Sequence, residues 1–279
     1  MSEMWRRFLR HRLAVAGLGL ILVLILLALA APRVAPHDPI RQDLPRALAG
    51  PSAEFPLGTD EFGRCILSRI LYGARLSLLV GVIATAIGAA VGILSGLAAG
   101  YFPRLDAPIM RVMDVLLAFP SILLAIAVVA ALGPSLVNVM IAVGVRSIPS
   151  YARLARSMVL SLKELEFVQG ATALGASHPR VLFRHILPNS VSPLLVFSSM
   201  QIATAILLAA ILSFLGLGVQ PPTPEWGKMV SDGRAYLMEA PHVSLFPGLA
   251  IFVAVMGFNC LGDGLRDALD PRVGRVAVE

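Results

Sequence analysis

The residue types that perform chemistry are few in this chain, and none forms a recognisable catalytic or metal-binding pattern. The two cysteines, Cys65 and Cys260, lie far apart in sequence, so burial as small apolar residues is expected rather than a disulfide framework or a zinc site. The sequence contains no phosphate-binding Gly-x-x-x-x-Gly-Lys-Ser/Thr loop and no His-Glu-x-x-His zinc pair. We therefore expect no catalytic residue, no metal site and no bound cofactor. The histidines, none with ligand-like neighbours, are His11, His37, His178, His185 and His242.

Arg146 interrupts an otherwise apolar stretch and is the single charged residue with a possible role in a buried pathway. About 13 residues separate it from Gly133, where a turn is expected. An arginine at the centre of a membrane helix costs roughly 2.5 to 3.5 kcal/mol, so it normally faces protein, water or the interface. One hypothesis is that Arg146 faces a pathway or a partner subunit. The alternative is that its side chain extends toward the cytoplasm.

The composition indicates a membrane protein. The 279 residues are 57% hydrophobic and 14% charged, and the mean hydropathy is +0.81. A soluble globular chain is usually about a quarter charged. The formal charge of +6 comes from basic residues that flank apolar runs. This arrangement argues against nucleic-acid binding and for the bias that keeps Lys and Arg on the cytoplasmic side of a membrane.

Uncharged stretches long enough to cross a bilayer, roughly 20 helical residues, recur along the chain. We expect an all-α integral membrane protein with about six transmembrane helices, because the runs are continuously apolar and do not alternate as barrel strands do. The stretch from 115 to 145 is divided by Gly133-Pro134-Ser135 into a third and a fourth span. The expected spans lie within residues 13–31, 76–102, 115–132, 136–145 and beyond, 186–224, and 243–262.

The basic residues predict the orientation, with both termini in the cytoplasm. Arginines precede the first span, and six crossings return the C-terminus to the same side. Ala28-Leu29-Ala30 resembles a signal-peptide cleavage site, but the apolar run is too long for a signal, so an uncleaved anchor is expected. The basic residues expected inside are Arg6, Arg7, Arg10, Arg12, Arg104, Arg111, Arg153, Arg156, Lys163, Arg180, Arg184, Arg266, Arg272 and Arg275, against Lys228 and Arg234 in the short outer loops.

The segment from 161 to 189 is the most informative polar stretch. It consists of good helix formers with Gly175 as a break and Pro188 near the start of the next helix, so we expect two short helices hinged near Gly175. A connection between two spans needs only a few residues, so about 30 ordered residues indicate a docking surface. An amphipathic helix lying on lipid headgroups is the alternative, and the spacing does not decide between the two.

The same segment resembles the cytoplasmic coupling loop of binding-protein-dependent ABC importer permeases. The family pattern is a Glu-Ala-Ala triplet, a glycine four residues later and a Leu-Pro pair, and the matching residues here are Ala171, Gly175, Leu187 and Pro188. Gln169 and Gly170 depart from the triplet. The resemblance implies docking of an ATPase by residues Glu164, Glu166, Gln169, Gly170, Ala171, Gly175, Ala176, Ser177, Arg180, Arg184, Leu187 and Pro188.

Further segments are similar to the dipeptide, oligopeptide and nickel branch of these permeases. They are PLGTDEFGR at 56–64, LSRILYGARLSLLVG at 67–81, DVLLAFP at 114–120, LSFLGLGVQPPTPEWG at 212–227 and GDGLRDALDPR at 262–272. The resemblance implies the type I importer permease fold, in a bacterial inner membrane. Residues 1–75 would hold the cytoplasmic start, first helix and long outer loop, residues 76–268 a five-helix core with the coupling loop at 161–189, and residues 269–279 a cytoplasmic tail.

The resemblance also implies the partners and the activity. It indicates two ABC ATPase subunits that use ATP and Mg²⁺, a second homologous permease subunit and an extracytoplasmic substrate-binding protein, around a chain embedded in the lipid bilayer. This chain would move peptides, nickel or other small solutes by alternating access and would not hydrolyse ATP. A membrane enzyme, or a channel without an ATPase, is the alternative.

Four local patterns add structural expectations. Gly88, Gly92, Gly96 and Gly100 recur every four residues, so that face of the second span should pack closely against another helix. Arg69 and Arg75 suggest a helix at the outer interface whose arginines reach water. An outer loop ends in Gln220 to Pro224 and Trp226, where an aromatic ring favours the interface. Asp263, Arg266, Asp267 and Asp270 are spaced for pairing along a helix.

Overall fold

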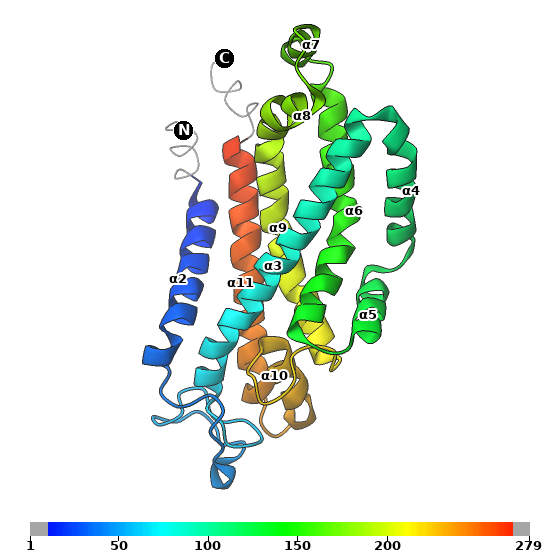
Figure 1. Cartoon of the computed structure of the whole chain (residues 1–279). Helices are drawn as coiled ribbons and strands as arrows, with labels where there is room; N and C mark the ends of the chain where they lie inside the picture. The colour runs from blue at the N-terminus through cyan, green and yellow to red at the C-terminus, as the bar shows by residue number, and fades with distance from the viewer. Residues whose placement is uncertain (1–10, 270–279) are drawn as a thin grey trace.

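The computed structural model describes residues 11–269, and this part of the chain is helical with no named strand (Figure 1). The all-helical prediction is confirmed. The long helices are α2 (Arg12–Val34), α3 (Ile66–Tyr101), α4 (Pro103–Ala118), α5 (Ser121–Leu132), α6 (Leu136–Leu162), α9 (Leu187–Phe214) and α11 (His242–Leu269). The short helices are α7 (Glu166–Ala173), α8 (His178–Arg180) and α10 (Trp226–Gly233), with a π-helical turn at Val181–Ile186.

The long helices run between two ends of one elongated bundle. The connections at one end hold α7 and α8, and those at the other hold α10 and the loop that follows α2; we name these the α7 end and the α10 end (Figure 1). The chain passes from end to end in α2, α3, the α4–α5 pair, α6, α9 and α11. The start of α2 and the end of α11 both lie at the α7 end. Arg6, Arg7, Arg10, Asp270, Arg272 and Arg275 fall outside the described residues.

The membrane-spanning character follows from length and composition. Four helical stretches are each long and apolar enough to cross a bilayer, namely α2, α3, α8–α9 and α11, and the bent α4–α5 pair makes a fifth. Helix α6 has 27 residues and traverses the bundle but carries Arg146, Arg153 and Arg156. The expectation of about six spans agrees approximately with this arrangement.

The expected third span is not one straight helix. Helix α4 ends at Ala118 and α5 begins at Ser121, and the two axes differ by 94°. Phe119 is extended, with φ −85° and ψ 135°. Proline disfavours helical geometry in the residue before it and removes an amide donor, so Pro120 accounts for the break. The Gly133 turn between α5 and α6 has the left-handed φ of 92° that glycine permits.

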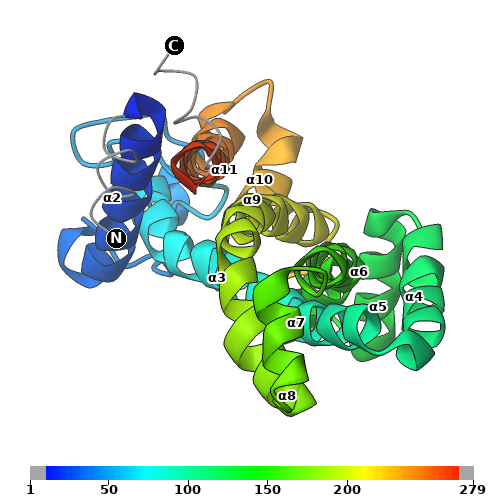
Figure 2. The same ribbon diagram turned by 90° about the horizontal axis from the view of Figure 1, so that it is seen from above.

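The glycine face of α3 packs on α6, as its spacing predicts, and the partner is within this subunit. Figure 2 shows α3 and α6 adjacent in the view from above. A Cβ atom placed on Gly92 would lie 2.6 Å from the carbonyl oxygen of Ile148 and 2.5 Å from Cβ of Tyr151. Gly88, Gly96 and Gly100 meet other residues of α6 in the same way. The missing side chains therefore let the two backbones approach closely.

The position of Trp226 in an expected outer loop suggested an anchor at the membrane interface, and this expectation is wrong. Its side chain is buried, and its indole Nε1 donates a hydrogen bond of 3.0 Å to the carbonyl of Ile70. Glu225 before it accepts hydrogen bonds of 2.9 Å from the amides of Gly227 and Lys228 and thereby caps α10. Helix α10 is thus folded back into the bundle and closes the α10 end between α9 and α11.

The close packing of α3 and α6 predicts a steric effect of a single methyl group. Gly92→Ala should lower the thermal unfolding temperature of the purified protein, because overpacking against backbone costs about 1 to 3 kcal/mol. Gly19→Ala is the matched control, since nothing lies within 4 Å of a Cβ atom on Gly19 of α2. Detergent-solubilised variants compared by thermal unfolding would measure this. Equal unfolding temperatures for Gly92→Ala and the wild type would refute the close α3–α6 contact.

Candidate functional site

The predicted coupling segment forms a compact projection at the α7 end (Figure 1). Helix α7 ends at Ala173, and Gly175 follows with a left-handed φ of 79°. This agrees with a hinge near Gly175. The second helix differs from the expectation, because α8 continues through the π-helical turn into α9 without a break. The long helix α9 is therefore joined directly to the coupling segment.

The underside of the segment is anchored on two long helices. Val168 of α7 and Val181, Leu182 and Ile186 of the π-helical turn are buried in one cluster with Leu97 of α3 and Val159 of α6. The hydroxyl of Tyr101, at the end of α3, lies 3.0 Å from Nδ1 of His178. A displacement of α7 would therefore move the ends of α3, α6 and α9 together, because packed interiors transmit strain.

The outer side of the segment is exposed and partly apolar. Leu174 is 91% exposed, and Leu165, Phe167 and Phe183 are exposed as well. Exposed apolar patches with a polar rim mark protein or membrane contacts. The structure brings all predicted docking residues into this projection or its junction with α9. Glu164, Glu166, Gln169, Gly170, Gly175, Ser177, Arg180, Arg184 and Pro188 are exposed, and Ala171, Ala176 and Leu187 are half-buried.

Gln169 and Gly170, which depart from the family triplet, both affect the local structure of α7. Gln169 lies in α7, and its side-chain amide donates a 3.2 Å hydrogen bond to the carbonyl of Glu164. Gly170 is exposed, and a Cβ atom on it would meet nothing within 4 Å. Glycine inside a helix is less stable than alanine by roughly 0.5 to 1 kcal/mol. Helix α7 is therefore intrinsically weaker than it would be with alanine at 170.

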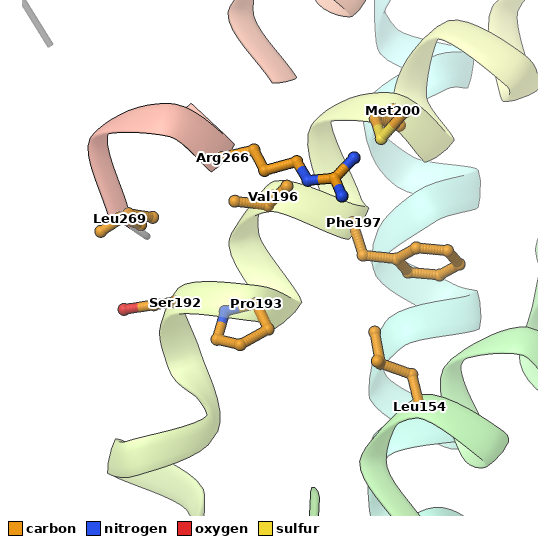
Figure 3. A pocket seen from close by; sticks show the side chains of 8 residues that line it. All are labelled: Leu154, Ser192, Pro193, Val196, Phe197, Met200, Arg266 and Leu269. Carbon is orange, nitrogen blue, oxygen red and sulfur yellow. The ribbon is translucent and has the colours of Figure 1, made fainter. Parts of the chain in front are cut away.

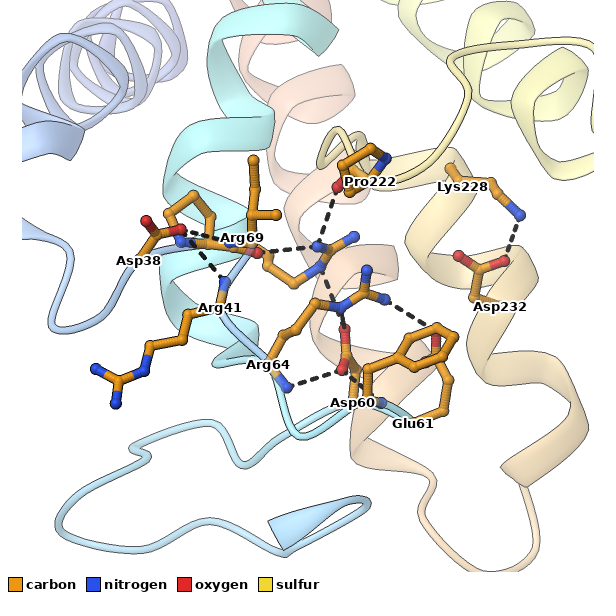
Figure 4. A network of polar contacts seen from close by, with 12 residues as sticks. Asp38, Arg41, Asp60, Glu61, Arg64, Arg69, Pro222, Lys228 and Asp232 are labelled. Atoms are coloured by element: carbon orange, nitrogen blue, oxygen red, sulfur yellow. Dashed lines mark hydrogen bonds and ion pairs between the residues drawn. The ribbon is translucent and has the colours of Figure 1, made fainter. Parts of the chain in front are cut away.

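A network of buried ion pairs at the α10 end was not predicted from the sequence. Asp60 receives hydrogen bonds of 2.9 Å from the amide and 2.6 Å from Nε of Arg64, and Nε of Arg69 lies 3.3 Å from the same carboxylate (Figure 4). Arg69 also donates to the carbonyls of Pro39 at 3.0 Å and Pro222 at 3.4 Å. The expectation that Arg69 reaches water is wrong, because it is 2% exposed.

This network is structural. It joins the loop after α2, the start of α3 and the proline-rich loop before α10, which are far apart in sequence. Neighbouring Glu61 accepts a 2.9 Å hydrogen bond from Arg64, while burial and the charge of Asp60 raise the pKa of Glu61. The spacing of Asp60 and Arg64 was a detectable signal, but the distant carbonyl partners of Arg69 were not. Arg75 instead donates to two carbonyls of α2, those of Ala28 and Leu29.

An apolar hollow of about 460 Å³ lies between α6, α9 and α11 (Figure 3). The guanidinium of Arg266 extends over α9 beside Val196, Phe197 and Met200 (Figure 3). The predicted pairing along α11 is not seen among the described residues; Oδ2 of Asp267 instead lies 3.0 Å from Nε2 of His11, the residue before α2. The hollow is a packing surface with one charge and brings no set of reactive groups together.

Arg146 lies on α6, away from the coupling segment, and is half-buried. It makes no hydrogen bond or ion pair with any residue from 11 to 269. Within the same range no three His, Cys, Asp or Glu residues are grouped to hold a metal ion. Cys65 is buried and Cys260 half-buried, and both are free thiols.

Comparison with known families gives two matches. A model described as "Binding-protein-dependent transport system inner membrane component" matches residues 69–275. A model described as "N-terminal TM domain of oligopeptide transport permease C" matches residues 1–51. Together the matched ranges cover both ends and the core of the chain.

Individual proteins are also similar. The dipeptide transport system permease protein DppC of Alkalihalophilus pseudofirmus is 50% identical over 272 residues, which is 97% of this chain and 90% of that protein. The glutathione transport system permease protein GsiD of Pectobacterium atrosepticum is 51% identical over 273 residues, 97% of this chain and 91% of that protein.

Solved structures share the fold. An inward-facing structure of the MetNI methionine ABC transporter matches with a TM-score of 0.59 and 16% identity, over 74% of this chain and 98% of that chain. An amino acid ABC transporter matches with a TM-score of 0.53 and 14% identity, over 71% of this chain and 92% of that chain. At these identities the likeness concerns the fold alone.

The buried network at the α10 end predicts a large effect of removing one charge. Asp60→Asn would leave two buried arginines without their shared carboxylate, and breaking a buried pair costs about 3 to 5 kcal/mol. A marked fall in the thermal unfolding temperature is expected. Glu54→Gln is the control, because Glu54 pairs with Arg46 at the surface, where such pairs contribute about 0 to 1 kcal/mol. Similar unfolding temperatures for the two variants would contradict the network's role.

The two glycines of the coupling segment should respond oppositely to alanine. Gly170→Ala should stabilise α7 by roughly 0.5 to 1 kcal/mol, since the site is helical and open. Gly175→Ala should destabilise the segment by about 1 to 2 kcal/mol, because its φ of 79° is unfavourable for a residue with a Cβ atom. Amide hydrogen exchange over residues 166–173 would report both changes. Protection that moves in the same direction in both variants would disprove the hinge.

Proposed function

This chain belongs to the family of binding-protein-dependent transport system inner membrane components, in its dipeptide and oligopeptide branch, and from this we propose how it works within an ATP-driven importer. The chain is a membrane-embedded permease subunit of such an importer. As a permease it has a transport role and no catalytic one. The relatives it resembles are named for transport of dipeptides and of glutathione, and we take small peptides as its solutes.

The coupling segment is the site at which the chain docks an ATPase. The observation that supports this proposal is the contrast between the two sides of the coupling segment. The underside packs on α3, α6 and α9, while the outer side exposes Leu174. An exposed leucine on a rigid projection suits a groove on a partner protein. Closure of the ATPase would push α7, and the long helices beneath it would move as rigid bodies. Alternating access requires different contacts in two states, and this linkage supplies the mechanical connection.

The remaining assembly follows the family's pattern. Two ATPase subunits that use ATP and Mg²⁺, a second homologous permease and an extracytoplasmic binding protein complete the importer. The α7 end is the cytoplasmic end, so both termini lie in the cytoplasm of a bacterium. Residues 1–75 are an N-terminal addition with its outer loop, residues 76–268 the transport core and residues 269–279 the tail. The binding protein docks at the α10 end.

Co-purification tests the docking site. The tagged chain, expressed in its own host and extracted in mild detergent, should carry ATPase subunits and a second permease identifiable by mass spectrometry. Leu174→Asp should reduce the recovered ATPase about tenfold or more, since one buried leucine contributes about 1.5 to 3 kcal/mol and each 1.4 kcal/mol is tenfold. The second permease should remain.

Met238→Asp is the matched control, because Met238 is 100% exposed near the α10 end, far from the coupling segment, and the change should leave the ATPases and the second permease bound. If the ATPases stay with the Leu174→Asp variant, the docking face is wrong. If the wild-type chain purifies without any ATPase while a known importer keeps its own, the importer assembly itself is refuted.

A further inference from the structure

One face of the bundle, formed by α4 and α6, carries two ion pairs between the helices. Arg156 of α6 binds Asp106 of α4 through two hydrogen bonds of 2.6 Å, and Arg153 binds Asp114 at 2.6 Å. Asp114 and Arg153 remain 60% and 56% exposed despite this bond. A hollow of about 560 Å³, lined by these four residues with Pro103, Ala107 and Met110, opens along the face.

The break between α4 and α5 lies on the same face. Residues 119 to 123 are all exposed, and no side chain caps the start of α5. Backbone outside a helix is not tolerated against hydrocarbon; at membrane depth it occurs only where protein covers it or water reaches it. The α4–α6 face therefore does not lie against acyl chains. By contrast, the exposed side chains along the middle of α2, such as Leu22, Leu26 and Leu29, are apolar.

Arg146 lies level with this break. Met113 of α4 clusters with Ile148 of α6, and Ala125 of α5 clusters with Val143, so the break lies beside the stretch of α6 between them. Arg146 precedes Arg153 by seven residues, which is about two turns, so the two share a helix face. It also lies about 15 Å from the start of α6 at Leu136, close to the middle of that helix.

The difference between Arg146 and its neighbours is its partner. Arg153 and Arg156 each bind an aspartate supplied by α4, whereas Arg146, on the stretch of α6 level with the break, forms no hydrogen bond or ion pair with residues 11–269. The aspartates of α4 thus give Arg153 and Arg156 permanent ion pairs within the chain. A half-buried arginine without a carboxylate is costly in a membrane and marks a pathway or binding site.

We propose that the α4–α6 face is one wall of the aqueous translocation path and that Arg146, at the α4–α5 break, binds a carboxylate of the passing solute. The guanidinium group matches a carboxylate in two parallel hydrogen bonds, which a peptide's terminal carboxylate can accept. The inference rests on the proposed function, because it names the chemical group that the importer handles. The hollow beside Asp114 and Arg153 continues the wall toward the α7 end.

Transport measurements test the binding role. The complete importer in proteoliposomes, with its binding protein, is given radiolabelled alanyl-alanine or the same dipeptide with an amidated C-terminus. Arg146→Gln should reduce uptake of the free dipeptide roughly tenfold or more, the loss expected for one charge-assisted hydrogen-bonded pair. Arg146→Lys should be intermediate. Uptake of the amidated dipeptide should differ little between Arg146→Gln and wild type. Arg12→Gln, at an exposed arginine at the start of α2, controls for loss of one charge.

Two results would overturn the binding role. If Arg146→Gln transports the free dipeptide as well as wild type, Arg146 does not hold the solute. If the variant loses the second permease on purification, Arg146 is a subunit contact instead. The affinity of the binding protein for the dipeptide, measured separately, should be unaffected by the change in this chain.

Labelling tests the wall without relying on transport. In the assembled complex, Ser121→Cys and Arg146→Cys should react with a membrane-impermeant methanethiosulfonate reagent, while Leu26→Cys on α2 should not. If neither position on the α4–α6 face reacts, the wall is refuted even if uptake is robust. If the two react but the wild type moves neither dipeptide, the path stands, the carboxylate role of Arg146 is refuted for dipeptides, and the proposed solute class is wrong.

Discussion

The close contact between α3 and α6 is the interaction on which the rest of this structure depends. Four glycines on one face of α3 bring the two backbones together, so these helices form a pair with little room to slide or rotate. Other elements attach to this pair. The coupling segment packs on the ends of both helices, α5 and α4 pack along α6, and α9 crosses α3 near Gly81, where a Cβ atom would lie 2.6 Å from Ile206.

Helix α3 connects the two ends of the molecule without interruption. Its 36 residues span about 54 Å, from the buried ion network at Arg69 to the contact between Tyr101 and His178. At the α10 end, Asp60 holds the loop after α2 against the start of this helix. At the α7 end, the coupling segment rests on its last turn. A displacement of the coupling segment would therefore act on a continuous helix whose far end is fixed to the loops of the α10 end. This arrangement favours rigid-body motion over local deformation.

The sequence predicted the features that depend on local pattern. The apolar runs, the Gly133 turn, the glycine face of α3 and the break at Gly175 each follow from residue types within one segment, and the structure contains all of them. The errors concern residues whose environment is set by distant segments. Arg69 is buried because carbonyls at Pro39 and Pro222 reach it, and Trp226 is buried because α10 folds back toward Ile70. Spacing along the chain contains no information about either contact.

The break at Pro120 was within reach of local reasoning, since proline restricts the residue before it, but the uncharged run around it favoured a continuous span. The α4–α6 face could not be predicted from this uncharged run. The aspartates of the face lie in α4 and its arginines in α6, on either side of the Gly133 turn.

The arginines are paired differently at three heights along the bundle, and the pairing at each height suits a different role. At the α10 end, Asp60, Arg64 and Arg69 are buried and mutually paired, which suits a joint that does not open. In the half of α6 nearer the α7 end, arginines are paired yet exposed to a hollow. At mid-depth, Arg146 has no partner among residues 11–269. A solute carboxylate that binds an unpaired arginine does not have to displace a counter-ion, so the arrangement fits the proposed binding of a solute by Arg146.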